Sequence, residues 1–92
     1  MLTAECARDK MIRMFENKVE KLILAACEQG KMTCNTRMVE GLYHTGNGNL
    51  IKYVPHIPRL LRNLKQAGYD ATWHEKELES TGIIEGYLFI NW

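Results

Sequence analysis

The sequence contains no long uninterrupted apolar run. The longest run, Leu22–Cys27, is far shorter than the ~18–20 residues that a membrane-spanning helix needs. The first ten residues already carry several charges, including Glu5 and Arg8, which a secretory signal would not tolerate before its apolar segment. We therefore expect an intracellular protein that neither enters a membrane nor carries a secretory signal.

An excess of charge of one sign is also absent. The 12 Lys and Arg residues are balanced by 11 Asp and Glu residues, so the net charge is +1. General attraction to nucleic acids or anionic membranes depends on net positive charge. A nucleic-acid function would therefore need a local basic patch.

Cysteine is scarce and odd in number. No two of Cys6, Cys27 and Cys34 have the close spacing of a zinc or redox motif. We interpret them as free thiols in a reducing compartment. The rest of the composition, 46% hydrophobic and 25% charged, is typical of a globular protein, and 92 residues suffice for one domain spanning 1–92.

The N-terminal third predicts one long amphipathic helix. Thr3 is a suitable N-cap and Gly30 a suitable residue to end the helix, which should span about Ala4–Gln29, ~38 Å at 1.5 Å per residue. A helix of this length should overhang the rest of so small a domain. Asp9 and Arg13 are spaced for a favourable pair on its polar face. Apolar residues recur at steps of three and four: Ala4, Ala7, Met11, Met14, Phe15, Val19, Leu22, Ile23 and Ala26.

The following segment is predicted less sharply. Lys31–Thr36 alternates with a period of two, which indicates a short strand. Gly46-Asn47-Gly48-Asn49 indicates a turn. This turn could join a hairpin of Met38–His44 and Leu50–Val54, or it could be the tip of a surface loop. We favour an irregular loop with a partial hairpin over residues 38–54.

A second helix is predicted between the prolines Pro55 and Pro58 and the terminating Gly68. Its apolar positions are Ile57, Leu60, Leu61, Leu64 and Ala67. A strand over 69–74, a polar connection over 75–82 and a buried strand over 83–92 should complete the chain. The order predicts an α+β fold with both helices on one face of a small three- to four-stranded mixed sheet, whose last two strands form an antiparallel pair.

Several local features together resemble small uncharacterised proteins encoded by bacteriophages. These features are the helix start Thr3-Ala4-Glu5-Cys6-Ala7, the helix end Leu64-Lys65-Gln66-Ala67-Gly68-Tyr69 and the terminus Ile90-Asn91-Trp92. The segment 39–55 and the connection 75–82 depart from that pattern. The resemblance implies a viral protein located in the host cytoplasm or the virion, and it implies no catalytic activity.

No chemical motif predicts an enzyme. His44, His56 and His74 could join Cys34 as metal ligands, but none has ligand spacing on a single element. Cys34 could act as a nucleophile with His44 or His74, but no nucleophile motif surrounds it. Gly46 and Gly48 indicate a turn, because the Gly-Lys-Ser/Thr ending of a phosphate-binding loop is missing. We predict no catalytic residue, metal or cofactor.

Two surfaces are candidate binding sites. Leu24 lies on the polar face of the first helix, and together with Arg13 and Glu20 it indicates contact with a protein partner or a second copy. The second site is basic and aromatic, and it could contact nucleic-acid phosphates. Its residues are Lys52, Tyr53, Arg59 and Arg62. We therefore expect a non-enzymatic phage protein acting through protein–protein contacts, as a minor virion component or a host-directed modulator. The alternative is a nucleic-acid or nucleotide-binding module that uses the second helix.

Overall fold

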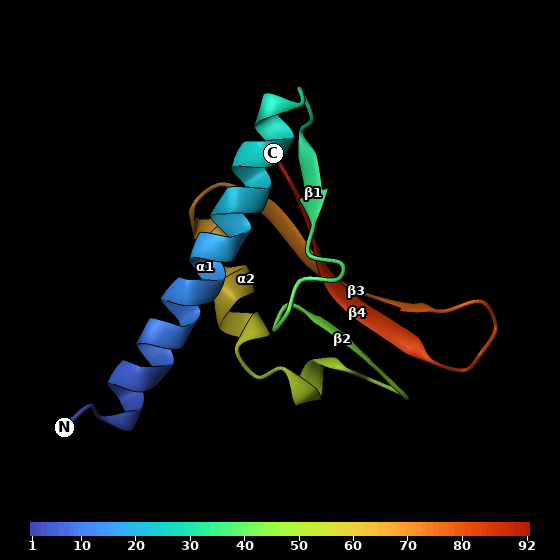
Figure 1. The fold of residues 1–92 in the computed structure, drawn as a ribbon, viewed down its shortest axis with the longest axis horizontal. Helices are drawn as coiled ribbons and strands as arrows, with labels where there is room; N and C mark the ends of the chain where they lie inside the picture. Colours follow the sequence, from blue (N-terminus) through green and yellow to red (C-terminus); the bar gives the residue numbers. More distant parts are fainter.

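The computed structural model describes residues 1–92 as two helices on one side of a four-stranded sheet (Figure 1). The α+β class and the long N-terminal helix agree with the sequence analysis. The elements are α1 (Ala4–Glu28), β1 (Thr33–Asn35), β2 (Tyr43–Gly46), the 3-10 helix η1 (Ile51–Tyr53), α2 (Ile57–Gln66), β3 (Asp70–Glu77) and β4 (Ile84–Asn91).

α1 begins and ends close to the predicted residues. The side-chain oxygen of Thr3 accepts the backbone N–H of Cys6 at 3.1 Å, which satisfies one of the free donors of the first turn. No residue before Ile12 is buried, so the N-terminal end of the helix extends past the sheet (Figure 1). Of the predicted apolar stripe, Phe15, Val19, Ile23 and Ala26 are buried. The stripe was wrong in its first half, where Ala4, Ala7, Met11 and Met14 are exposed and the buried residue is Ile12, which the stripe did not include.

α2 also forms as predicted. Ile57, Leu60 and Leu64 are its buried residues. Gly68 has a φ of 97°, which a glycine adopts without steric cost. The next backbone N–H, that of Tyr69, donates to the carbonyl of Leu64 at 3.1 Å. This bond closes the helix in the manner expected of a glycine cap.

β4 is the central strand of the sheet. β3 pairs along one edge of β4, and β1 and β2 lie one after the other along the opposite edge. β3 continues to Glu77, so part of the segment predicted as a connection, 75–82, is strand. The β3–β4 hairpin itself is confirmed.

All strand pairs are antiparallel, whereas the sequence analysis expected a mixed sheet. β1 and β3 do run in the same direction, because each is antiparallel to β4. They are not neighbours, however, since β4 lies between them. β4 takes the central place because its alternate residues include the most apolar side chains of the sheet, among them the fully buried Leu88 and Ile90.

The segment 38–54 is an irregular loop with one strand. β2 shares only Tyr43 and His44 with the first predicted hairpin arm, extends to Gly46 of the predicted turn, and pairs with β4. The second arm forms η1 and no strand. Gly41 has a φ of 82° and lies so close to the Phe15 ring that a β-carbon would overlap it. This close approach explains why a glycine occurs in an otherwise strand-like stretch.

The core lies between the helices and the near face of the sheet. Eleven buried residues form one cluster: Phe15, Val19, Ile23, Leu42, Val54, Ile57, Leu60, Leu64, Ala71, Leu88 and Ile90. α1 also contacts the residue that precedes α2, through a stack of the Phe15 and His56 rings with centroids 4.3 Å apart. The opposite face of the sheet carries no helix (Figure 1).

Candidate functional site: the outer surface of the first helix

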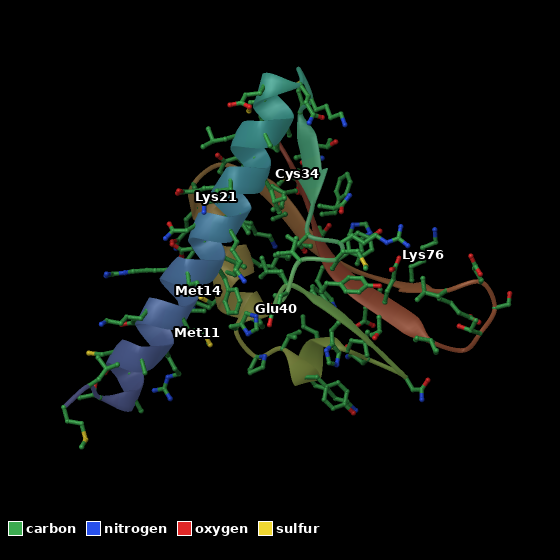
Figure 2. All side chains as sticks on the ribbon, viewed as in Figure 1. Met11, Met14, Lys21, Cys34, Glu40 and Lys76 are labelled. Atoms are coloured by element: carbon green, nitrogen blue, oxygen red, sulfur yellow. The ribbon has the colours of Figure 1, made fainter.

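The outer surface of α1 carries a stripe of positive charge. Lys10, Arg13, Lys18 and Lys21 lie around one shallow depression, together with Met14 and Asn17. With Met14 and Asn17 between them, steps of three and four place these cations along one side of the helix, facing away from the buried residues. Figure 2 shows Lys21 and Met14 on this helix, on the side of the molecule opposite the β3–β4 hairpin. We call Lys10, Arg13, Lys18 and Lys21 the basic stripe.

The cations of the basic stripe have no carboxylate partners. The two ion pairs of the structure are Arg37–Glu85 and Arg59–Asp9. The expected pair between Asp9 and Arg13 is therefore wrong. Asp9 pairs with Arg59 of α2 at 2.7 Å instead, because the second helix packs on the flank of α1 that carries Asp9.

Lys18 is the only member of the stripe whose side chain makes a hydrogen bond. Its ammonium group donates to the backbone carbonyl of Glu40 at 3.2 Å and lies 5.5 Å from the centre of the Phe15 ring. Its charge thus remains uncompensated by any carboxylate. The stripe is a local positive surface on a chain whose total charge is close to zero.

An apolar groove lies beside the stripe, between α1 and α2. Its volume is about 270 Å³. Its apolar lining includes Val19, Ile23, Leu64 and Tyr69. At one end of the groove the side-chain amide of Asn63 donates to Glu16 at 2.7 Å, which ties the two helices together. We call this feature the α1–α2 groove.

The predicted partner-contact residues lie on this surface. Glu20 lines the α1–α2 groove, and both Glu20 and Leu24 line its extension beside Ile23 and Tyr69. Leu24 is 63% exposed, which is high for an apolar side chain. Arg13 belongs to the neighbouring basic stripe. The fold thus brings Glu20 and Leu24 together and places Arg13 in the neighbouring basic stripe. The role of these three residues in binding a partner remains a prediction.

The predicted phosphate-contact residues are spread over several places. Arg59 and Arg62 line different depressions, and Arg59 is neutralised by Asp9. Lys52 lies in η1 with its ammonium 5.1 Å from the centre of the Tyr53 ring. They therefore do not converge on one phosphate position, although each could still contact a nucleic acid.

Sequence reasoning missed Lys10 and Lys18. Their helical spacing with Arg13 and Lys21 was visible, but acidic residues are interspersed among them in the sequence. Only the packing of α2 shows that Asp9 and Glu16, on one flank of α1, contact Arg59 and Asn63 of α2 and not the cations of the stripe. The stripe therefore required the arrangement of the helices.

The three histidines lie in different local environments. The His56 ring nitrogen Nε2 is 2.7 Å from the carbonyl oxygen of Gly41. His44 lies beside the Tyr53 ring, and His74 packs against Tyr87 and Phe89. No three His, Cys, Asp or Glu side chains form a group that could hold a metal ion.

Cys34, the considered nucleophile, is half-buried in β1. Burial raises the pKa of its thiol, and the nearby Cys27 raises it further. Because the thiolate is the reactive form, these surroundings reduce its reactivity at neutral pH.

No helix has the length and apolar character required to cross a membrane. Comparisons with protein-family models, curated proteins and solved structures give no match to this chain.

Proposed function

We propose that this protein is a non-enzymatic binding protein that attaches to another protein through the outer surface of α1. The observation that carries the proposal is the position of the unpaired basic stripe directly beside the α1–α2 groove and the exposed Leu24. Apolar area supplies the driving force of protein association, and flanking charges set the orientation of the partner.

The two features define the chemistry of the partner. A groove of about 270 Å³ lined by Val19, Ile23 and Leu64 accommodates one or two apolar side chains. The basic stripe, which runs over the preceding turns of the same helix, favours acidic groups. An amphipathic segment with apolar anchors and acidic flanks fits both features, as in helix-in-groove recognition.

A protein partner is favoured over a nucleic acid at this surface. Met14 and Leu24 are 47% and 63% exposed within or beside the stripe, and apolar side chains add nothing to phosphate contacts. The resemblance to phage-encoded proteins further suggests a partner in the virion or in the host. A minor virion component and a host-directed modulator both fit such a surface.

Two sets of charge reversals test the proposal. The stripe variant is Lys10→Glu with Arg13→Glu and Lys21→Glu. The matched control is Lys52→Glu with Arg62→Glu and Lys65→Glu, which changes the net charge equally on exposed residues elsewhere. A third variant, Leu24→Asp, tests the groove end. All three should fold, because the changed side chains are exposed.

The readout is site-specific photo-cross-linking from position 17 in cells that express the protein. We expect a discrete protein adduct that weakens at least several-fold in the stripe variant and in Leu24→Asp, and persists in the control. The proposal is wrong if no protein adduct forms, if the stripe variant leaves it unchanged, or if the adduct is removed by nuclease. Sedimentation of the purified protein distinguishes a second copy from a different partner.

A further inference from the structure

The face of the sheet away from the helices carries a cluster of aromatic rings. Along β4, Leu88 and Ile90 point into the core, so Tyr87 and Phe89 lie on the opposite face. Tyr87 pairs with Tyr43 of β2 on one side and with His74 of β3 on the other. Because directly paired residues share a face, Tyr43, Tyr87 and His74 form one row across three strands, and Phe89 lies in the next row. We call these four residues the aromatic face.

The rings of the aromatic face are accessible and ordered by their neighbours. His74 is exposed, and the other three residues are half-buried. The His74 ring lies 6.0 Å from that of Tyr87, nearly parallel to it at 16°, and 5.4 Å from that of Phe89. No helix covers this side of the sheet (Figure 1). The core on the other face holds the strands in place, so the rings form a pre-organised surface.

Hydrogen bonds further fix the ring of Tyr43. Its hydroxyl donates to the carboxylate of Glu85 at 2.8 Å, and the same oxygen accepts Nε of Arg37 at 3.1 Å. Glu85 is only 1% exposed. Its negative charge is therefore held beneath Tyr43 and Arg37 and is not presented at the surface.

Exposed charges of both signs lie beside the rings: Asp70 is in the row beyond Phe89, and two cations lie at the other end of the face. Lys76 pairs with Glu85 across β3 and β4 and lies on the side of the hairpin away from α1 (Figure 2). The Arg37 side chain is 53% exposed. In the row of Phe89, Asn35 and Thr72 add exposed hydrogen-bonding groups. The aromatic face thus combines planar rings, two accessible cations and polar side chains.

We infer that the aromatic face binds single-stranded nucleic acid, with two bases stacked on Tyr87 and Phe89. Residues two apart on a strand lie roughly 6.6 Å from each other, which allows two bases that are not stacked on one another. Sheets that recognise single-stranded RNA use aromatic residues in this way, and base stacking tolerates any sequence. A duplex hides its base faces, so it does not compete for these rings.

Arg37 and Lys76 provide the contacts to phosphates. Because Nε of Arg37 is already paired with the Glu85 carboxylate, we expect weak dependence on salt: the logarithm of the association constant should fall with the logarithm of salt concentration with a slope between about −0.7 and about −1.4. This site is separate from the outer surface of α1, and the inference does not rest on the proposed protein partner.

The test is fluorescence anisotropy at low salt with labelled single-stranded RNA and DNA dodecamers of mixed sequence and with the matching duplex. We expect the single strands to bind more tightly than the duplex. Tyr87→Ala and Phe89→Ala should each weaken binding by roughly 5- to 150-fold. Tyr87→Phe and Phe89→Tyr retain a ring and should bind within a few-fold of the natural chain, which separates stacking from folding.

Charge variants, and NMR mapping of the oligonucleotide-binding surface on the natural protein, complete the test. Lys76→Glu should weaken binding and flatten the salt dependence, whereas the control on Lys52, Arg62 and Lys65 should retain binding. The NMR signals of His74 and Tyr87 should shift with the oligonucleotide. The inference is overturned if single strands do not bind, if the duplex binds equally, if the ring-removing variants bind normally, or if only the basic-stripe variant abolishes binding. Capture of a protein by this face, without oligonucleotide binding, would also overturn it.

Discussion

The indole ring of Trp73 occupies the position that a side chain at Gly86 would take on the neighbouring strand. A β-carbon built on Gly86 overlaps the six-membered part of the ring. The same indole donates its N–H to Glu75 at 3.1 Å, and Glu75 pairs directly with Gly86 across β3 and β4. A glycine in the central strand therefore leaves room for the Trp73 ring beside Gly86, from where its N–H reaches Glu75.

We expect Gly86→Ala to destabilise the protein by about 1–3 kcal/mol, the usual range for overpacking. Gly86 does not have a positive φ, so the cost should come from the ring and not from the backbone. Urea unfolding measures it. In the Trp73→Leu background the same substitution should cost much less, and equal costs in both backgrounds would refute the steric explanation.

Thr36 joins the two short strands at the edge of β4. Its hydroxyl donates to the carbonyl of Leu42 and accepts the backbone N–H of Leu88, both at 2.8 Å, in a fully buried position. Thr36→Val keeps the shape of the side chain but leaves both backbone groups without a partner. Each unpaired group should lower the free energy of unfolding by roughly 1–3 kcal/mol. We expect a clear loss of stability in urea unfolding. Thr36→Ser keeps the hydroxyl and should lose less; equal losses would contradict this role.

Glu75 fixes the start of η1. One of its carboxylate oxygens accepts the backbone N–H groups of Leu50 at 2.6 Å and Ile51 at 3.2 Å. Because hydrogen bonds to a charged group contribute about 1.5–3 kcal/mol, Glu75→Leu should speed amide hydrogen exchange at Leu50 at least about tenfold. The effect at Ile51 should be smaller, because the side-chain oxygen of Asn49 also accepts that N–H at 3.2 Å. Glu75→Gln retains an acceptor oxygen and should have a smaller effect. Unchanged exchange in Glu75→Leu would show that the packing of Leu50 alone holds the segment.

Tyr43 should titrate abnormally. Its hydrogen bond to Glu85 is the main cause that raises the pKa of its hydroxyl above the usual 10.0, with burial as the second cause. The folded state therefore holds this proton more tightly than the unfolded state does. The associated stability is present below pH 10 and is lost as the pH rises through the raised pKa.

Phenolate absorbance measures this titration. Subtracting the curve of Tyr43→Phe from that of the natural protein should give a midpoint above the usual 10.0. Tyr43→Phe should also lose stability at neutral pH and show a smaller further decline above pH 10. A midpoint for Tyr43 at or below 10 would contradict the hydrogen bond to Glu85.

The sequence by itself determined the two helices and the final hairpin. Thr3, Gly30 and Gly68 mark helix ends through local backbone chemistry, and the apolar spacing around Phe15 and Leu60 is a local property of a helix. The hairpin of β3 and β4 joins neighbouring segments of the chain. Such signals do not depend on how distant parts of the chain are placed.

The tertiary structure alone decided the pairing of β2, the antiparallel sheet and the surfaces with binding potential. Pairing of Tyr43 with Tyr87 joins residues far apart in the sequence, and several alternatives had similar local signals. The Asp9–Arg59 pair, which frees Arg13, likewise depends on the contact between the helices. The aromatic face exists because the core took up the alternate residues Leu88 and Ile90, which leaves Tyr87 and Phe89 on the side without helices.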